Sequence, residues 1–110
     1  MRRMDRPARI LADHADAIRS FCERWRISEL ALFGSVLRTD FRPASDIDVL
    51  VRFDTPDHPW TVLDHLEMER ELGDLFGQPV EITSRAAIEG SPNWLRRREI
   101  LSTAQTLYAA

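Results

Sequence analysis

Residues 34–48 read GSVLRTDFRPASDID, and this segment decides which fold and which site we expect. The apolar run ahead of it, residues 29–33 (ELALF), has the length of a strand and ends at Gly34 and Ser35. Gly34 lacks a Cβ, so a ligand can approach the backbone, and Ser35 is a good N-cap for a helical turn whose free N–H groups attract an anion. The junction favours a phosphate, although a strand that ends in an ordinary turn is the alternative.

Two carboxylates, Asp46 and Asp48, stand at the head of a second apolar run, residues 47–53 (IDVLVRF), which predicts a strand. Side chains alternate across a strand, so Asp46, Asp48, Leu50 and Arg52 should share one face, and Ile47, Val49, Val51 and Phe53 the other. Like charges this close repel, and a cation between them would relieve the repulsion. Paired carboxylates with substrate phosphates are a normal ligand set for Mg²⁺, whereas a solvated strand entrance is the alternative.

The other elements follow from the spacing of apolar residues. Residues 8–25 and 60–76 show helical spacing, and Gly77 is a natural end for the second helix. Residues 79–83 (PVEIT) predict a third strand in which Glu81 faces either water or the Asp pair. A final helical stretch is expected from Pro92 to about Tyr108.

These elements predict the fold class. We expect a single α/β domain over residues 1–110, with a small mixed sheet of three to four strands. The amphipathic helices should cover one face of the sheet, and the open face should hold the site.

Composition narrows the class of protein. The net charge is −3, with 15 basic against 18 acidic residues, which disfavours non-specific nucleic-acid binding. Every basic residue is Arg, so no Lys nucleophile exists, but a local Arg cluster can still bind a triphosphate.

The single Cys22 cannot form an internal disulfide, and no apolar run approaches the roughly 20 residues of a membrane span. The N-terminus has no signal-peptide pattern, so we expect a cytoplasmic protein without a membrane partner.

The motif around the site resembles that of a known family. Leu32-Phe33-Gly34-Ser35, then Arg38, Arg42-Pro43 and residues 45–51 (SDIDVLV), are similar to the motif of the minimal nucleotidyltransferases of the DNA polymerase β-like superfamily. One departure is Thr39, where relatives often carry Gly. The resemblance implies transfer of a nucleoside monophosphate from a nucleoside triphosphate, with ATP as the expected donor, to an acceptor hydroxyl.

The resemblance also implies roles for individual residues. Asp46 and Asp48 would hold two Mg²⁺ ions, and Glu81, at a position where the family more often has Asp, would be a further ligand or the base. The nucleotide would be bound by Gly34, Ser35, Arg38 and Ser45. The cluster Arg96-Arg97-Arg98 has two interpretations, a solvated face or a surface that contacts a partner or phosphate.

The partner expected from the resemblance is a protein. Larger relatives add a helical domain that helps to bind base and acceptor, and 110 residues leave no room for one. Minimal transferases of this type are often antitoxins that pair with a small helical HEPN-domain toxin and modify it by AMPylation. Two alternatives stay open, namely a catalytically silent module that neutralises a partner by contact, and a nucleotidyltransferase that acts on a small molecule such as an antibiotic.

Overall fold

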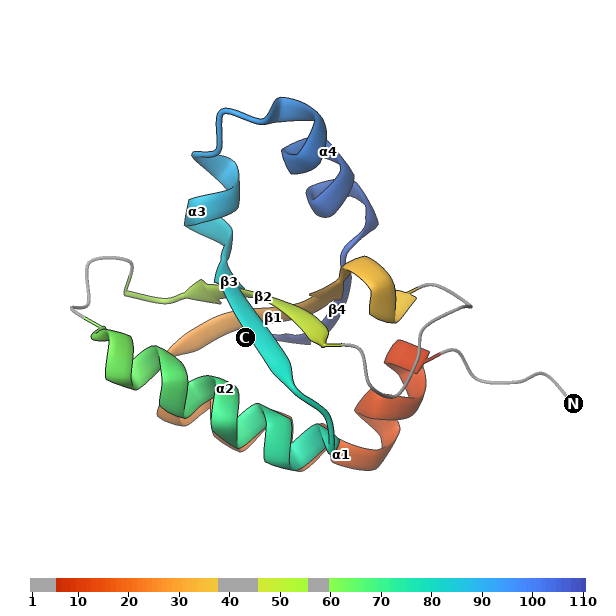
Figure 1. Ribbon diagram of the computed structural model, residues 1–110. Coiled ribbons are helices and arrows are strands. Elements are labelled where there is room, and N and C mark those ends of the chain that lie inside the picture. Colours follow the sequence, from red (N-terminus) through yellow and green to blue (C-terminus); the bar gives the residue numbers. More distant parts are fainter. Residues whose placement is uncertain (1–5, 38–45, 56–59) are drawn as a thin grey trace, which may run out of the picture.

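The computed structural model describes residues 6–37, 46–55 and 60–110 (Figure 1). In chain order its elements are α1 (Arg6–Arg24), β1 (Ile27–Phe33), the 3-10 turn η1 (Gly34–Leu37), β2 (Ile47–Phe53), α2 (Val62–Phe76), β3 (Val80–Ser84), α3 (Arg85–Glu89), α4 (Trp94–Thr103) and β4 (Gln105–Ala109). The predicted strand after the Gly-Ser junction and the predicted strand around Glu81 are both present. The α/β class is therefore confirmed.

The strands form one mixed sheet in the order β3-β2-β1-β4. Strand β1 pairs antiparallel with both β2 and β4, whereas β2 and β3 are parallel neighbours. Helix α2 makes the connection between β2 and β3, because parallel neighbours need a crossover. This confirms the small mixed sheet, and it places the strand that carries Glu81 directly beside the strand that carries Asp48.

The two faces of the sheet differ in what covers them. The longer helices α1 and α2 lie on one side, and α3 and α4 lie on the other (Figure 1). The first face supplies the larger core, which includes Ile47, Val49 and Val51 as the alternation predicts. On the second face Leu50 packs with Ala31, Phe33, Ile88 and Ile100. Because these apolar side chains must leave water, the face predicted to be open is partly covered by α3 and α4.

The C-terminal segment corrects one prediction. The helical stretch expected to run to Leu107 and Tyr108 ends at Thr103, and residues Gln105–Ala109 form strand β4. The hydroxyl of Thr103 donates to the carbonyl of Glu99 at 2.6 Å, and the chain then becomes extended. Leu107 is buried in the larger core, so β4 follows the alternation of a half-buried strand. Leu95, an apolar residue of α4, is 61% exposed.

Helix α2 has well-defined ends. At its start the Thr61 hydroxyl accepts from the backbone N–H of Asp64, while the Asp64 carboxylate accepts from the Thr61 N–H, which is a capping box. At its end Gly77 adopts a left-handed conformation with φ of 72°, as expected of the predicted stop. Among the described residues no helix is long and apolar enough to cross a membrane.

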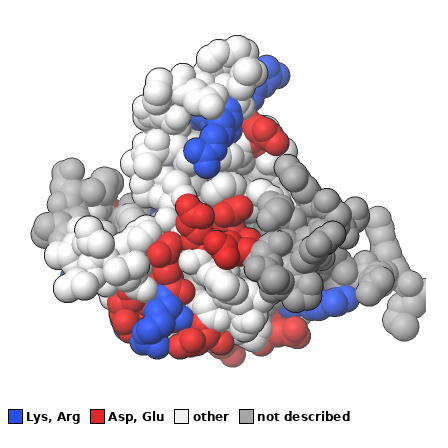
Figure 2. Space-filling view, viewed as in Figure 1, with Lys and Arg blue, Asp and Glu red and all other residues white. Residues whose placement is uncertain are grey.

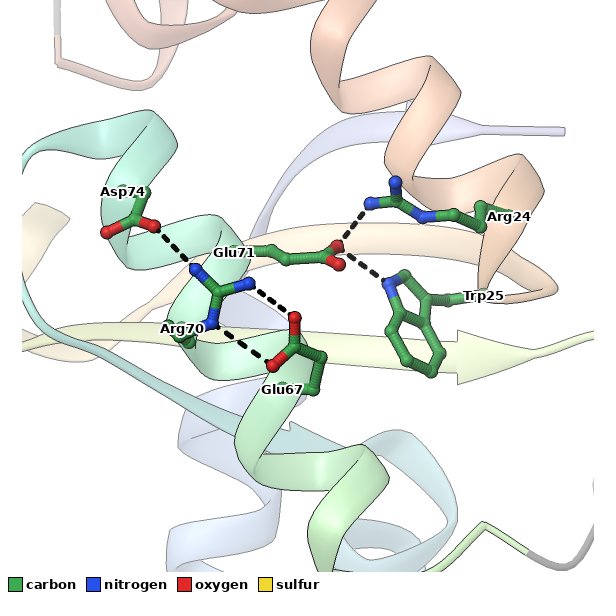
Figure 3. Close-up of polar contacts among 6 residues, drawn as sticks. All are labelled: Arg24, Trp25, Glu67, Arg70, Glu71 and Asp74. Atoms are coloured by element: carbon green, nitrogen blue, oxygen red, sulfur yellow. Dashed lines mark hydrogen bonds and ion pairs between the residues drawn. The ribbon is translucent and has the colours of Figure 1, made fainter.

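One carboxylate joins the two long helices. Glu71 of α2 accepts a hydrogen bond from the Trp25 indole at 2.9 Å and also pairs with Arg24, both at the end of α1 (Figure 3). Its side chain is only 21% exposed. Glu67, one turn earlier, pairs with Arg70 of its own helix at the surface. Glu71 therefore holds α1 against α2, whereas Glu67 supports only α2.

This contrast gives a stability prediction. Glu71→Ala should lower the free energy of unfolding by about 1–2 kcal/mol, because the part-buried Trp25 indole N–H loses its acceptor. The matched variant Glu67→Ala loses only exposed pairs and should change stability by less than about 0.5 kcal/mol. Urea unfolding of both variants measures the difference. Equal losses in the two variants would contradict the linking role of Glu71.

Candidate active site

Two carboxylates from neighbouring strands lie together on the second face of the sheet, and a third precedes one of these strands. The parallel register of β2 and β3 places Asp48 directly beside Glu81. Both point away from the larger core, since Ile47 and Ile82 are buried in it. Asp46 immediately precedes β2 and is exposed. In Figure 2 acidic side chains gather at the centre of the view, where β2 and β3 lie in Figure 1.

Among the residues that the structure describes, negative charge predominates around Asp48. Burial raises the pKa of Asp48 above its usual value of 3.8, and the negative charges of Glu81 and Asp46 raise it further. The guanidinium of Arg96, on α4, acts in the opposite direction and lowers the pKa of Asp48 by a smaller amount. A site in which carboxylates outnumber the nearby cations attracts a further cation.

Gly34 lies against Asp48. It has a positive φ of 75°, and a Cβ at this position would lie 2.5 Å from Oδ2 of Asp48. Register explains the contact, because Phe33, the residue before Gly34, is the β1 partner of Asp48. The turn predicted to follow is present as η1, which contains Ser35. A residue without a side chain is therefore needed here for the backbone conformation and for the position of the carboxylate.

A pair of glycine substitutions tests this contact. Gly34→Ala and Gly77→Ala both place a Cβ at positive φ and should each cost about 1 kcal/mol of stability, but nothing lies within 4 Å of a Cβ at Gly77. Only Gly34→Ala must push the Asp48 carboxylate aside. For the nucleotidyl transfer that the motif resemblance implies, we expect about a 10²-fold loss in Gly34→Ala and little loss in Gly77→Ala. Melting curves and transfer rates measured together check this, and equal activity in the two variants would contradict it.

Part of the predicted site lies outside the residues that the structure describes. Arg38 and Ser45, predicted to bind the nucleotide, lie outside the described residues, as do Thr39 and Arg42. Within the described segments, no three His, Cys, Asp or Glu side chains are arranged as a ready metal site. The chemistry of the donors nevertheless fits Mg²⁺, because Asp48 and Glu81 are neighbours that carry hard carboxylate oxygens, and the charge of Asp46 also acts on Asp48.

Helix α4 contributes residues that the sequence did not single out. A cavity of about 220 Å³ lies between the turn after β1 and α4, and it is lined by Gly34, Leu37, Glu99, Ile100 and Thr103. The three residues from α4 follow helical spacing, which was the available signal, but nothing in the sequence tells which face of α4 meets the sheet. Two larger hollows lie elsewhere and are lined by none of the predicted site residues.

Residues 15–107 match the nucleotidyltransferase domain family. The chain belongs to this family. The match begins inside α1 and ends inside β4, so it includes the whole sheet face that carries Asp48 and Glu81. The family resemblance expected from the sequence is thereby confirmed.

Individual relatives support the same assignment. A protein of Methanocaldococcus jannaschii, provisionally named a protein adenylyltransferase, is 38% identical over 68 residues, which cover 61% of this chain and 65% of the relative. The protein adenylyltransferase MntA of Thermococcus cleftensis is 31% identical over 80 residues, which cover 73% of this chain and 75% of the relative. The chain thus spans slightly less than two thirds of the length of the first of these relatives.

Solved structures share the fold. One, described as a provisionally assigned minimal nucleotidyltransferase, is 33% identical and superposes with a TM-score of 0.64 over 94% of this chain and 97% of its own. A second is a complex of a tri-AMPylated Shewanella oneidensis HEPN toxin with its MNT antitoxin, with 15% identity, a TM-score of 0.59, and coverage of 91% of this chain and 73% of the other. At that identity the second likeness concerns the fold alone.

Proposed function

We propose that this protein transfers AMP from ATP to a hydroxyl group on a partner protein, with release of pyrophosphate. The observation that carries the proposal is the placement of Asp48 between Glu81, its neighbour on β3, and Gly34, where an added Cβ would lie 2.5 Å from the Asp48 carboxylate. A phosphate-binding turn and a group of metal-binding carboxylates then lie side by side, which is the arrangement that phosphoryl chemistry needs. We also propose that residues 1–110 act as one domain in the cytoplasm.

Each residue has a part in the proposed reaction. The backbone N–H groups of the turn that starts at Gly34 and Ser35 would bind phosphate oxygens. Arg38 and Ser45 would add nucleotide contacts, as the resemblance implies. Asp46 and Asp48 would hold two Mg²⁺ ions through their carboxylates. When bound, Mg²⁺ neutralises triphosphate charge and lowers the pKa of the acceptor hydroxyl.

Glu81 has two possible parts in this scheme. Its position beside Asp48 lets its carboxylate serve as a further metal ligand or accept the proton of the attacking hydroxyl. We favour the second, because Asp46 and Asp48 with triphosphate oxygens and water can already complete a metal shell.

The proposed partner is a HEPN-type toxin. The support comes from the relative named as the protein adenylyltransferase MntA and from the fold shared with an MNT antitoxin in complex with an AMPylated HEPN toxin. On this proposal the chain acts as the antitoxin and inactivates its toxin by AMPylation.

Mass spectrometry of a co-expressed helical partner tests the proposal. The partner is incubated with the protein, Mg²⁺ and each of the four ribonucleoside triphosphates, and the intact mass is measured. We expect the mass increase of one or more AMP groups with ATP, and none when EDTA replaces Mg²⁺. A tight complex without a mass increase would favour the contact-only module, and AMP on an added aminoglycoside instead of the partner would favour the small-molecule enzyme.

A further inference from the structure

Helix α4 presents one face to the side of the sheet that carries the carboxylates. This face is formed by residues at helical spacings of i, i+3, i+4 and i+7, namely Arg96, Glu99, Ile100 and Thr103. Ile100 is only 7% exposed, and it packs in the smaller apolar cluster with Phe33 and Leu50. Because Ile100 is held against the sheet, the polar residues on either side of it stay beside the candidate active site.

The cavity under this face adjoins the phosphate-binding turn. Gly34 and Leu37 form one side, and Glu99, Ile100 and Thr103 form the other. Its volume of about 220 Å³ is smaller than the roughly 300–1,000 Å³ of pockets for drug-sized ligands. The cavity therefore suits one ring of a nucleotide, with the remainder of the ligand outside it. Since Gly34 also contacts Asp48, that remainder would extend over the carboxylates.

The charges along α4 indicate which part of a nucleotide the cavity can accept. Arg96 acts electrostatically on Asp48, whereas Glu99 follows about 4.5 Å further along the helix axis and lines the cavity. A phosphate is attracted to the guanidinium and repelled by the carboxylate. The side of the cavity formed by Glu99, opposite the Gly34 turn, is thus unsuited to phosphate and suited to a group that donates hydrogen bonds.

The Glu99 carboxylate is available for a ligand. Within the described residues its side chain forms no ion pair or hydrogen bond, and only its backbone carbonyl accepts bonds, from Ser102 and Thr103. A carboxylate that accepts from the hydroxyls of a ribose is a recurring arrangement in nucleotide sites. The floor formed by Leu37 and Ile100 is apolar and can pack against the sugar ring.

We propose that this cavity binds the ribose of the nucleotide and that Glu99 accepts hydrogen bonds from its hydroxyl groups. The inference rests on the proposed function, since it assigns the sugar of the same ATP whose phosphates lie at Gly34. It has a specific consequence. The protein discriminates ribonucleotides from 2′-deoxyribonucleotides through Glu99, and it does so independently of the base.

Calorimetric titration with ATP, 2′-deoxy-ATP and GTP in the presence of Mg²⁺ tests the inference. The whole 110-residue chain is compared with Glu99→Gln and with Glu23→Gln, an exposed control in α1 on the other side of the sheet. We expect the wild type to bind ATP about tenfold more tightly than 2′-deoxy-ATP, because a hydrogen bond to a charged acceptor is lost. This ratio should fall to about two in Glu99→Gln and stay unchanged in Glu23→Gln. We compare the ratio of the affinities for ATP and 2′-deoxy-ATP because removal of a negative charge near the triphosphate raises both affinities and cancels in this ratio.

Other outcomes separate the two proposals. Equal affinity of the wild type for ATP and 2′-deoxy-ATP, or an unchanged ratio in Glu99→Gln, overturns the ribose assignment and leaves the proposed function standing. A change in the ATP-to-GTP ratio of Glu99→Gln, with no change in the deoxy ratio, also overturns it, because Glu99 would then contact the base. If the wild type binds none of the three nucleotides, the proposed function fails, and the ribose assignment fails with it.

Discussion

Asp48→Asn is expected to lower the rate of AMP transfer by about 10³-fold while leaving the fold at least as stable as the wild type. The loss of transfer follows because an amide is a poor substitute for a carboxylate that holds Mg²⁺. Stability should not suffer, since the charge on Asp48 is unfavourable where it stands. Burial, Glu81 and Asp46 all raise the pKa of this carboxyl, so the folded protein disfavours its ionised form.

The pH dependence of stability has a definite sign. A carboxyl whose folded pKa is raised contributes stability that is fully present below its unfolded pKa and is lost as the pH rises through its folded pKa. Wild type and Asp48→Asn should therefore differ least at a pH below the usual value of 3.8, and the advantage of the variant should grow above that value. Thermal melting from acid to neutral pH in EDTA measures this difference.

Asp54→Asn is the matched control for Asp48→Asn. Asp54 directly follows the same strand at its other end and is exposed, and among the described residues its carboxylate accepts only a surface hydrogen bond from Thr55. Its substitution should leave transfer and the pH profile unchanged. If Asp48→Asn lowers the stability of the fold, the carboxylate has a structural role. If the variant keeps wild-type transfer, the proposed reaction is wrong.

Local pattern was sufficient to predict that Asp48 faces away from the larger core, and it left open whether Glu81 faces water or the Asp pair. Alternation along residues 47–53 places Asp48 opposite the core side chain Val49, and the apolar neighbours Val80 and Ile82 turn Glu81 the same way. These predictions rest on a period of two residues, which holds within any single strand. The Gly34 turn was likewise predictable, because its signal lies in adjacent residues.

Pairing between distant segments was beyond the sequence. The alignment of Asp48 with Glu81 depends on how α2 returns the chain beside β2. The sequence around either residue does not indicate that register. Strand β4 was mistaken for helix because five residues are too few to show a clear period, and its partner β1 lies more than 70 positions earlier in the chain. The position of Glu99 over the Gly34 turn follows from the packing of Ile100, which is a tertiary contact.

Glu81→Gln should reduce transfer by about 10²–10⁴-fold while ATP binding survives, if the carboxylate acts mainly as the base. Should it act mainly as a metal ligand, ATP affinity and the Mg²⁺ requirement would weaken together with the rate. The two roles differ because a base is needed only when the acceptor hydroxyl loses its proton, whereas a ligand is already needed when the nucleotide binds. ATP affinity and single-turnover rate, measured in parallel, separate them.

The conservative variant Glu81→Asp adds a control to this experiment. It keeps the carboxylate but shortens its reach by one methylene, and Asp is the more usual residue at this point in the minimal nucleotidyltransferases that the motif resembles. Because Asp48 is the direct neighbour of Glu81, an Asp at position 81 would also bring the second charge of the pair closer to its own strand β3. We expect Glu81→Asp to retain most of the transfer that Glu81→Gln loses. Wild-type affinity and rate in Glu81→Gln would remove this residue from the site and leave a centre of two carboxylates, Asp46 and Asp48.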